Sequence, residues 1–127
     1  METVTAAFAP DPRSARAARR FVERTLEAWN LTGAIEVVSL LTSELVANAV
    51  LHAGTPLELH LGVVGRRIRV QVRDRSAANA SPRHDGAEAT GGRGLRLVER
   101  LSDDWGVAEE GDGKTVWFEL SVPGTDS

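Results

Sequence analysis

The sequence predicts one α/β domain: a two-layer α/β sandwich whose mixed sheet is covered on one face by about three helices. Three observations predict this fold. Apolar residues recur at helical spacing before residue 54, two segments with alternating apolar and polar residues follow, and a further helix and hairpin pattern complete the chain. The 127 residues are enough for a single domain with its own core. We therefore treat residues 1–127 as one domain, with a frayed tail at 123–127.

Composition excludes several functional classes. Cysteine is absent, so a metal ion would need oxygen or nitrogen ligands. The net charge of −3 argues against a protein that binds nucleic acid directly. The sequence shows neither an apolar run of membrane-spanning length nor a signal peptide, so we expect a cytoplasmic protein without a membrane partner.

The first expected elements are an edge strand and a helix. Thr3–Phe8 is expected to form the strand, which could pair with a second copy or stay unpaired. Asp11 followed by Pro12 predicts the start of a helix that ends near Asn30. One face of this helix carries the arginines Arg13, Arg16, Arg19, Arg20 and Arg24. Such a face is more often solvated than binding, but five arginines without matching acids also fit an acidic protein partner.

The second helix, which ends around Gly54, carries the most informative stretch. The run Val37–Leu51 is apolar almost all round, which is typical of a buried helix. Glu44, Asn48 and His52 interrupt the run one turn apart and form a stripe. Buried polar groups need partners, which a ligand or metal ion could supply. The alternative is a solvated stripe on a surface helix, and this segment alone leaves both interpretations open.

A hairpin is expected next. Residues 57–63 and 68–74 alternate apolar and polar side chains around a turn at Gly65 and Arg66. Asp74 falls on the apolar face of the second strand, which makes it a candidate binding residue. The alternative is that the strand ends at Arg73 and that Asp74 only caps a turn.

A loop, a helix and a second hairpin complete the prediction. Residues 75–90 lack apolar periodicity and are typical of a long loop that forms a functional lid. The glycine-rich turn at 91–94 then opens a helix, where backbone N–H groups bind phosphate well, although such glycines often only make a turn. The last strands are expected at 104–108 and 115–122.

The order of these features resembles the ATP-binding domain of the GHKL superfamily, which includes gyrase, Hsp90, histidine kinases and MutL. The matching features are Glu-x-x-x-Asn on a helix, an Asp that closes a strand, a lid, Gly-Gly-x-Gly-Leu at a helix start, and Lys-Thr in a final hairpin. The stretch Glu44-Leu-Val-Ala-Asn48-Ala-Val-Leu-His52-Ala is most similar to the anti-sigma factor serine kinases of bacteria. The resemblance covers Arg16 to Val122 and implies the Bergerat-type ATP-binding fold, with an ATP lid at 76–94.

The resemblance also implies a role for each candidate residue. Glu44 would act as general base, and Asn48 would ligate Mg²⁺ against the phosphates of ATP. Asp74 would accept a hydrogen bond from the adenine amino group, and Thr115 would help to hold the same edge of the base. The residues that close the lid over the phosphates would be Gly91, Gly92, Arg93, Gly94 and Leu95.

Two features depart from the family pattern. The family usually has Asp-x-Gly-x-Gly, whereas Asp74 is followed by Arg-Ser-Ala-Ala, without either glycine. Strict alternation also places Thr115 with Trp117 and Glu119, opposite Val116. Either a bulge re-aims Thr115 or its role is indirect.

The function implied by the resemblance is an anti-sigma factor that sequesters a sigma factor and, with ATP, phosphorylates a serine or threonine of a STAS-type antagonist. Arg16, Arg19 and Arg20 are the expected partner-binding residues, on account of their unbalanced charge. The missing glycines favour an alternative, a nucleotide-binding regulatory module that binds a protein partner without phosphorylating it. A small ATPase with no protein substrate ranks third.

Overall fold

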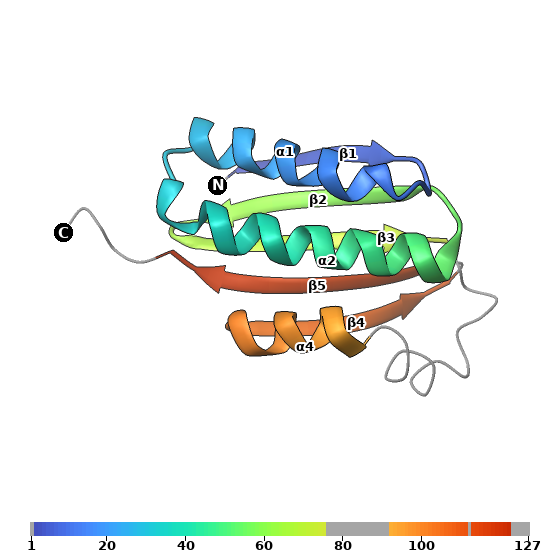
Figure 1. Cartoon of the computed structure of the whole chain (residues 1–127). Coiled ribbons are helices and arrows are strands. Elements are labelled where there is room, and N and C mark those ends of the chain that lie inside the picture. The colour runs from blue at the N-terminus through green and yellow to red at the C-terminus, as the bar shows by residue number, and fades with distance from the viewer. Residues whose placement is uncertain (1, 76–91, 112, 123–127) are drawn as a thin grey trace.

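The computed structural model of the chain describes residues 2–75, 92–111 and 113–122, which form two layers (Figure 1). The elements follow in the order β1 (Glu2–Phe8), α1 (Arg13–Ala28), the 3-10 helix η1 (Thr32–Ala34), α2 (Ile35–Ala53), β2 (Leu57–Val64), β3 (Arg67–Asp74), α4 (Gly92–Leu101), β4 (Asp104–Glu110) and β5 (Gly113–Ser121). The strands form one five-stranded sheet with the order β1-β2-β3-β5-β4. The helices α1, α2 and α4 all cover the same face of this sheet (Figure 1). The predicted two-layer sandwich is therefore confirmed.

The expectation of a mixed sheet was wrong for the described strands, because every neighbouring pair among them is antiparallel. The connection from β1 to β2 shows why. Helix α1 carries the chain back along the sheet and α2 carries it forward again (Figure 1), so β2 starts at the end where β1 finished. A parallel pair would need a connection that returns the chain to the start of the first strand, as a single crossover helix does.

Local sequence explains where two of the helices begin and end. The N-cap of α1 is Pro12 and not Asp11 as predicted, although the Asp11 carboxylate does accept a hydrogen bond of 2.8 Å from the backbone N–H of Arg13, the first residue of the helix. Helix α1 ends at Ala28, slightly before the predicted end near Asn30. Helix α2 ends before Gly54, whose left-handed φ of 66° favours glycine at this position.

The core lies between the sheet and the helices. The inward positions of β2 and β3 are buried and alternate with more exposed positions, which confirms the predicted period of two. Phe118 of β5 has the largest fully buried side chain among the described residues. From the helix layer, Val38, Leu41 and Leu45 of α2 pack into the same core.

Helix α2 also corrects one expectation. The segment Thr32–Ala53 is long and apolar enough to cross a membrane, judged by length and composition alone, although the sequence analysis expected no such run. In the fold, α2 contacts α1 on one side, α4 on the other, and β2 and β3 beneath. The apolar surface of α2 therefore packs against its neighbours in the domain, as that of a central core helix does.

Candidate functional site

The polar stripe of α2 lies at the border between core and surface. Glu44 and Asn48 are half-buried, whereas His52 at the end of the helix is exposed. The adjacent residues Leu45 and Ala49 are buried, so α2 turns its apolar positions inward and leaves the stripe along its margin. The stripe is therefore neither enclosed in the core nor fully solvated. This position would let its polar side chains contact a ligand that binds at the surface of the domain.

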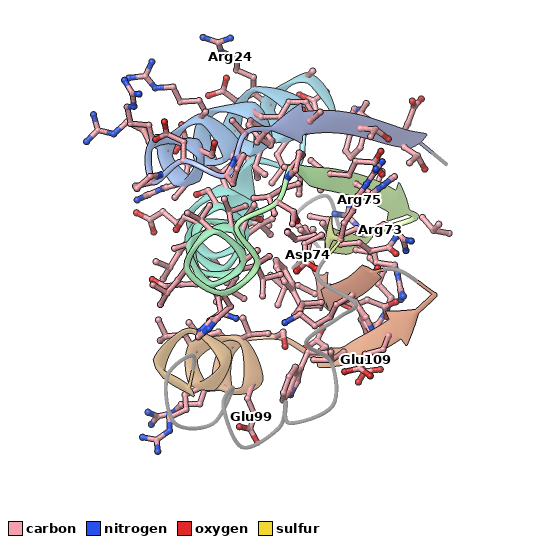
Figure 2. The ribbon with its side chains drawn as sticks, turned by 90° about the vertical axis from the view of Figure 1, so that its right-hand side faces the viewer. Arg24, Arg73, Asp74, Arg75, Glu99 and Glu109 are labelled. Carbon is pink, nitrogen blue, oxygen red and sulfur yellow. The ribbon has the colours of Figure 1, made fainter. Side chains whose placement is uncertain are left out.

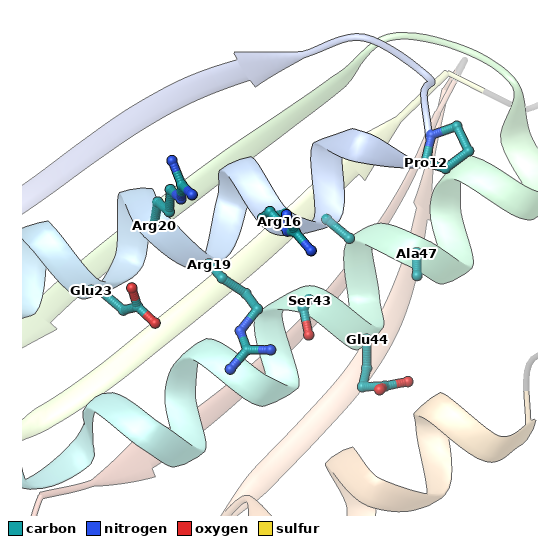
Figure 3. Close-up of a pocket in the computed structure, with 9 residues that line it drawn as sticks. Pro12, Arg16, Arg19, Arg20, Glu23, Ser43, Glu44 and Ala47 are labelled. Atoms are coloured by element: carbon teal, nitrogen blue, oxygen red, sulfur yellow. The ribbon is translucent and has the colours of Figure 1, made fainter.

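Glu44 lines an open groove between α1 and α2 (Figure 3). The residues lining this groove are Pro12, Ala15, Arg16, Arg19, Arg20 and Glu23 from the α1 side, and Ser43, Glu44 and Ala47 from α2. Figure 3 shows the Arg19 side chain extending from α1 toward α2 beside Ser43. The fold therefore brings the candidate base together with the three arginines that were predicted to bind a partner. Asn48 and Asp74 do not line the groove, so it is distinct from the predicted nucleotide contacts.

The groove carries unbalanced positive charge. Arg13, at the start of α1, pairs with Asp11 at 3.0 Å. In the described part of the chain, by contrast, Arg16, Arg19 and Arg20 form no ion pair, although Glu23 and Glu44 line the same groove. A groove with three unpaired guanidinium groups is complementary to an acidic surface.

Asp74 lies on the inner face of β3, as the alternation predicts. It belongs to the paired strand and is 2% exposed, so the alternative in which the strand ends at Arg73 is wrong. Figure 2 shows the Asp74 side chain on the helix side of the sheet and Arg73 on the open side. The chain therefore holds a carboxylate at the end of an apolar strand face, where an acceptor for a ligand's N–H groups would be shielded from water.

The backbone after Asp74 is tied to the connection between α2 and β2. The N–H of Arg75 donates a hydrogen bond of 3.0 Å to Oγ1 of Thr55. The Thr55 side chain therefore holds the backbone directly after Asp74 in place. Residues 76–78, where the family pattern has glycine and this chain does not, lie outside the described residues.

Thr115 does not share a face with Asp74. Strands β3 and β5 pair in continuous register from Arg67 with Ser121 to Asp74 with Lys114, so no bulge re-aims Thr115 along this pairing. Thr115 lies opposite Arg73 instead, on the face away from the helices. The register therefore does not place the Thr115 side chain beside that of Asp74.

Lys114, and not Thr115, lies beside Asp74 on the face of the sheet that meets the helices. It is the register partner of Asp74 and is half-buried. The sequence analysis did not place Lys114 beside Asp74, although the signal was available. Val116 was assigned to the apolar face, and counting back by two residues along a strand reaches Lys114.

The glycine-rich turn is described in part. Gly92, Arg93, Gly94 and Leu95 form the start of α4, so this helix begins earlier than the predicted start at Leu95. The first N–H groups of a helix have no partner within it, which is the property that favours phosphate. Gly91 and residues 76–91 of the predicted lid lie outside the described residues.

The donor set fits a magnesium ion that arrives with a nucleotide. Among residues 2–75, 92–111 and 113–122, no three acidic or histidine side chains are placed to hold a metal ion by themselves. The stripe offers the Asn48 amide oxygen and the Glu44 carboxylate. Mg²⁺ keeps several waters and takes one or two protein oxygens together with substrate phosphates, so such a sparse set is sufficient.

The sequence matches the histidine kinase-like ATPase domain over residues 8–120, which is most of the chain and includes every element from α1 to β4. The chain belongs to this family. No curated protein matches the sequence. Membership implies a nucleotide-binding domain of the kinase and ATPase type, and the site residues Glu44, Asn48 and Asp74 all lie within the matched range.

Solved structures share the fold of this histidine kinase-like ATPase domain. The RsbU and RsbW domains of Rv1364c from Mycobacterium tuberculosis superpose with a TM-score of 0.73 and 18% identity, over 96% of this chain and 33% of that one. The Acinetobacter baumannii histidine kinase AdeS gives 0.57 and 11% identity, over 98% of this chain and 70% of that one. The histidine kinase domain of the Erythrobacter litoralis EL346 blue-light activated histidine kinase gives a TM-score of 0.53 and 24% identity, over 72% of this chain and 46% of that one. The chain thus spans about a third of the first structure, and these likenesses show the fold alone.

Proposed function

We propose that this histidine kinase-like ATPase domain is a cytoplasmic anti-sigma factor. It would transfer the γ-phosphoryl group of ATP to a serine or threonine of a STAS-domain antagonist, and it would sequester a sigma factor in another state. The observation that carries the proposal is the groove that Glu44 shares with Arg16, Arg19 and Arg20. This groove puts a candidate general base on the same open surface as a candidate docking site for a protein.

The nucleotide would be held by residues of both layers. Asp74, buried on the inner face of β3, would accept a hydrogen bond from the amino group of adenine. The Asn48 amide oxygen would ligate the magnesium ion, and the start of α4 at Gly92–Leu95 would hold phosphate through its backbone N–H groups. Bound magnesium ATP supplies the phosphoryl group, and the chain needs only to position it and to neutralise its charge.

Glu44 would act on the partner's hydroxyl group. It lies one helical turn before Asn48, so both side chains project from the same margin of α2. A general base must come within hydrogen-bond distance of the proton that it takes. Glu44 lines an open groove, so a hydroxyl group carried on a protein surface can reach it without entering the core.

The arginines of the groove would select the partner. Three guanidinium groups without ion-pair partners in the described part of the chain attract an acidic surface and speed its association. The partner would therefore carry acidic residues close to the serine or threonine that reaches Glu44. The edge strand β1 offers a further surface, on which two copies could pair as a homodimer.

One sequence feature favours a second candidate function. Asp74 is followed by Arg-Ser-Ala-Ala in place of the two glycines of the family pattern, so the backbone has less freedom to approach the base closely. A nucleotide-binding regulatory module would bind its protein partner without phosphorylating it.

The test is phosphoryl transfer from radiolabelled ATP, with magnesium, to each STAS-domain protein of the source organism. The proposal expects label on a serine or threonine of at least one of them. The regulatory module expects tight partner binding with no transfer. Label released as free phosphate at the same rate with and without any protein partner would instead support a small ATPase and contradict both.

A further inference from the structure

We propose that Lys114 is a specificity residue of the nucleotide site: its ammonium group donates a hydrogen bond to N1 of adenine while Asp74 accepts one from the 6-amino group. The inference rests on the proposed function insofar as it takes an adenine nucleotide to be the ligand of Asp74. It gives a role to the lysine of the Lys-Thr pair, to which the resemblance assigned none.

The first argument is position. Asp74 and Lys114 are directly paired across β3 and β5, and side chains at paired positions of antiparallel strands leave the same face of the sheet. Val72 and Val116, the next pair on that face, are both buried. Asp74 and Lys114 therefore end the apolar face together, side by side at the border of the core.

The second argument is that Lys114 is not used elsewhere. It is half-buried, so part of its side chain is removed from water. Its other register partner is the exposed Glu109 of β4. Yet within residues 2–75, 92–111 and 113–122 the ammonium group forms no hydrogen bond or ion pair. Although both register partners of Lys114 are acids, this placement leaves its three N–H donors for a ligand.

The third argument is the chemistry of the base. An ionised Asp only accepts hydrogen bonds, and a lysine ammonium only donates them. The Watson–Crick edge of adenine presents a donor, the 6-amino group, beside an acceptor, the ring nitrogen N1. An acidic and a basic side chain on adjacent strands match this pair of groups, whereas Asp74 alone would leave N1 without a donor.

The close approach of β5 keeps the two residues together. A Cβ atom added to Gly113 would overlap the backbone oxygen of Asp74. This contact is possible only for glycine, and it holds the residue before Lys114 against the end of β3. The spacing between the two polar side chains is therefore set by the backbone.

The test compares two nucleotides and two variants. Lys114→Met keeps the apolar stem and removes the ammonium group, and 1-deaza-ATP replaces N1 of the base by C–H. We expect the wild-type chain with magnesium to bind 1-deaza-ATP about tenfold more weakly than ATP, since a hydrogen bond to a charged group is removed. Lys114→Met should bind both nucleotides alike, at about the affinity that the wild type shows for 1-deaza-ATP. Lys114→Arg, which keeps a donor, should restore part of the preference for ATP.

The matched control is Thr115→Val on the opposite face, which should leave both affinities unchanged. A preference for ATP that persists in Lys114→Met would overturn the inference while leaving the proposed function intact. Tighter binding of GTP than of ATP by the wild type would contradict both, because Asp74 would then not be reading the amino group of adenine. Failure of the wild type to bind any magnesium nucleotide would overturn both. A thermal unfolding curve for each variant distinguishes lost contacts from lost structure.

Discussion

Gly113 lies so close to Asp74 that a methyl group on it would overlap the Asp74 backbone oxygen. Gly113→Ala must therefore shift either β5 or the end of β3, and we expect it to lower the free energy of unfolding by about 1–3 kcal/mol, as overpacking does. It should also weaken ATP binding, because Asp74 moves with its backbone. Urea unfolding and an ATP titration measure the two effects.

The control for this change is Gly33→Ala, since a Cβ atom on Gly33 would meet no atom within 4 Å. It should leave both the stability and the ATP affinity nearly unchanged. Equal stability of Gly113→Ala and the wild type would show that β5 does not approach Asp74 as described.

Glu44 and Asn48 should have separable effects although they lie one turn apart. Glu44→Gln keeps the shape of the side chain and removes the base, so phosphoryl transfer to a partner should fall by about 10²–10⁴-fold, with nucleotide binding retained. Asn48→Ala should instead remove the dependence of ATP binding on magnesium. The two readouts are transfer of labelled phosphate and calorimetric titration with and without magnesium. If neither variant changed either readout, the site assignment would be wrong.

The arginine groove predicts which charge reversals matter. Reversing Arg16, Arg19 and Arg20 to Glu should weaken partner binding without changing ATP binding, because these residues line the groove.

Arg19→Glu and Arg24→Glu form a matched pair for the same surface. Arg24 is on the same helix but does not line the groove, and Figure 2 shows it pointing away from the domain. We expect at least tenfold weaker binding for Arg19→Glu, a smaller change for Arg24→Glu, and a loss of this difference at high salt. Unchanged partner affinity in the triple variant would rule out this docking surface.

Thr42 is expected to limit stability. Its side chain is fully buried in α2, and in the described part of the chain its hydroxyl oxygen has no hydrogen-bond partner. Thr42→Val removes this unsatisfied group at nearly constant volume, so we expect the free energy of unfolding to rise by about 1 kcal/mol. Ser39→Ala is the comparison, since the Ser39 hydroxyl donates a hydrogen bond of 2.6 Å to the Ile35 carbonyl oxygen and its removal should not stabilise the protein. A Thr42→Val variant less stable than the wild type would point to a partner for that hydroxyl.

Glu119 predicts a dependence of stability on pH. Its carboxylate accepts a hydrogen bond of 2.7 Å from Arg67 and a second one from Arg69, on the open face of the sheet. The hydrogen bond from Arg67, with a smaller contribution from Arg69, holds the pKa of Glu119 below its ordinary value of 4.5 although partial burial opposes this. A lowered folded-state pKa stabilises the fold above the unfolded-state value, and this contribution is lost as the pH falls through the folded-state pKa.

Glu119→Gln should therefore be less stable than the wild type at neutral pH, by less than about 1 kcal/mol, since both arginines are well exposed. The difference should shrink once the pH falls below 4.5. Urea unfolding of both proteins across this range measures it. A difference that stayed constant into strong acid would show that the ion pairs do not contribute.

The elements and the core were predictable because both follow from local periodicity. Alternation along β3 assigned Asp74 to the inner face, and its near-complete burial agrees. The sheet direction was not predictable in the same way, because it depends on how α1 and α2 pack side by side, which residue spacing does not specify. For the same reason the sequence could not show that Glu44 lines the same groove as the arginines of α1, since the packing of α1 against α2 decides it.

The placement of a candidate residue was predictable where its own strand decides its direction, as for Asp74, and not where a motif was carried over whole. The resemblance of the Lys-Thr pair in the last hairpin to the family pattern implied Thr115. The continuous register of β3 with β5 assigns that face to Lys114 instead. A motif records which residue types recur, whereas the pleat of a strand decides which of two neighbours meets the ligand.

The antiparallel order of the strands has a consequence for folding. Asp74 is the last residue of the β2–β3 hairpin, and Lys114 lies at the start of the second strand of the β4–β5 hairpin. The two residues lie side by side only where β3 pairs with β5, which joins these two halves of the sheet. A molecule that touches both would bind the finished domain and neither half, so its presence would favour the assembled protein and raise its melting temperature in proportion to the logarithm of ligand concentration.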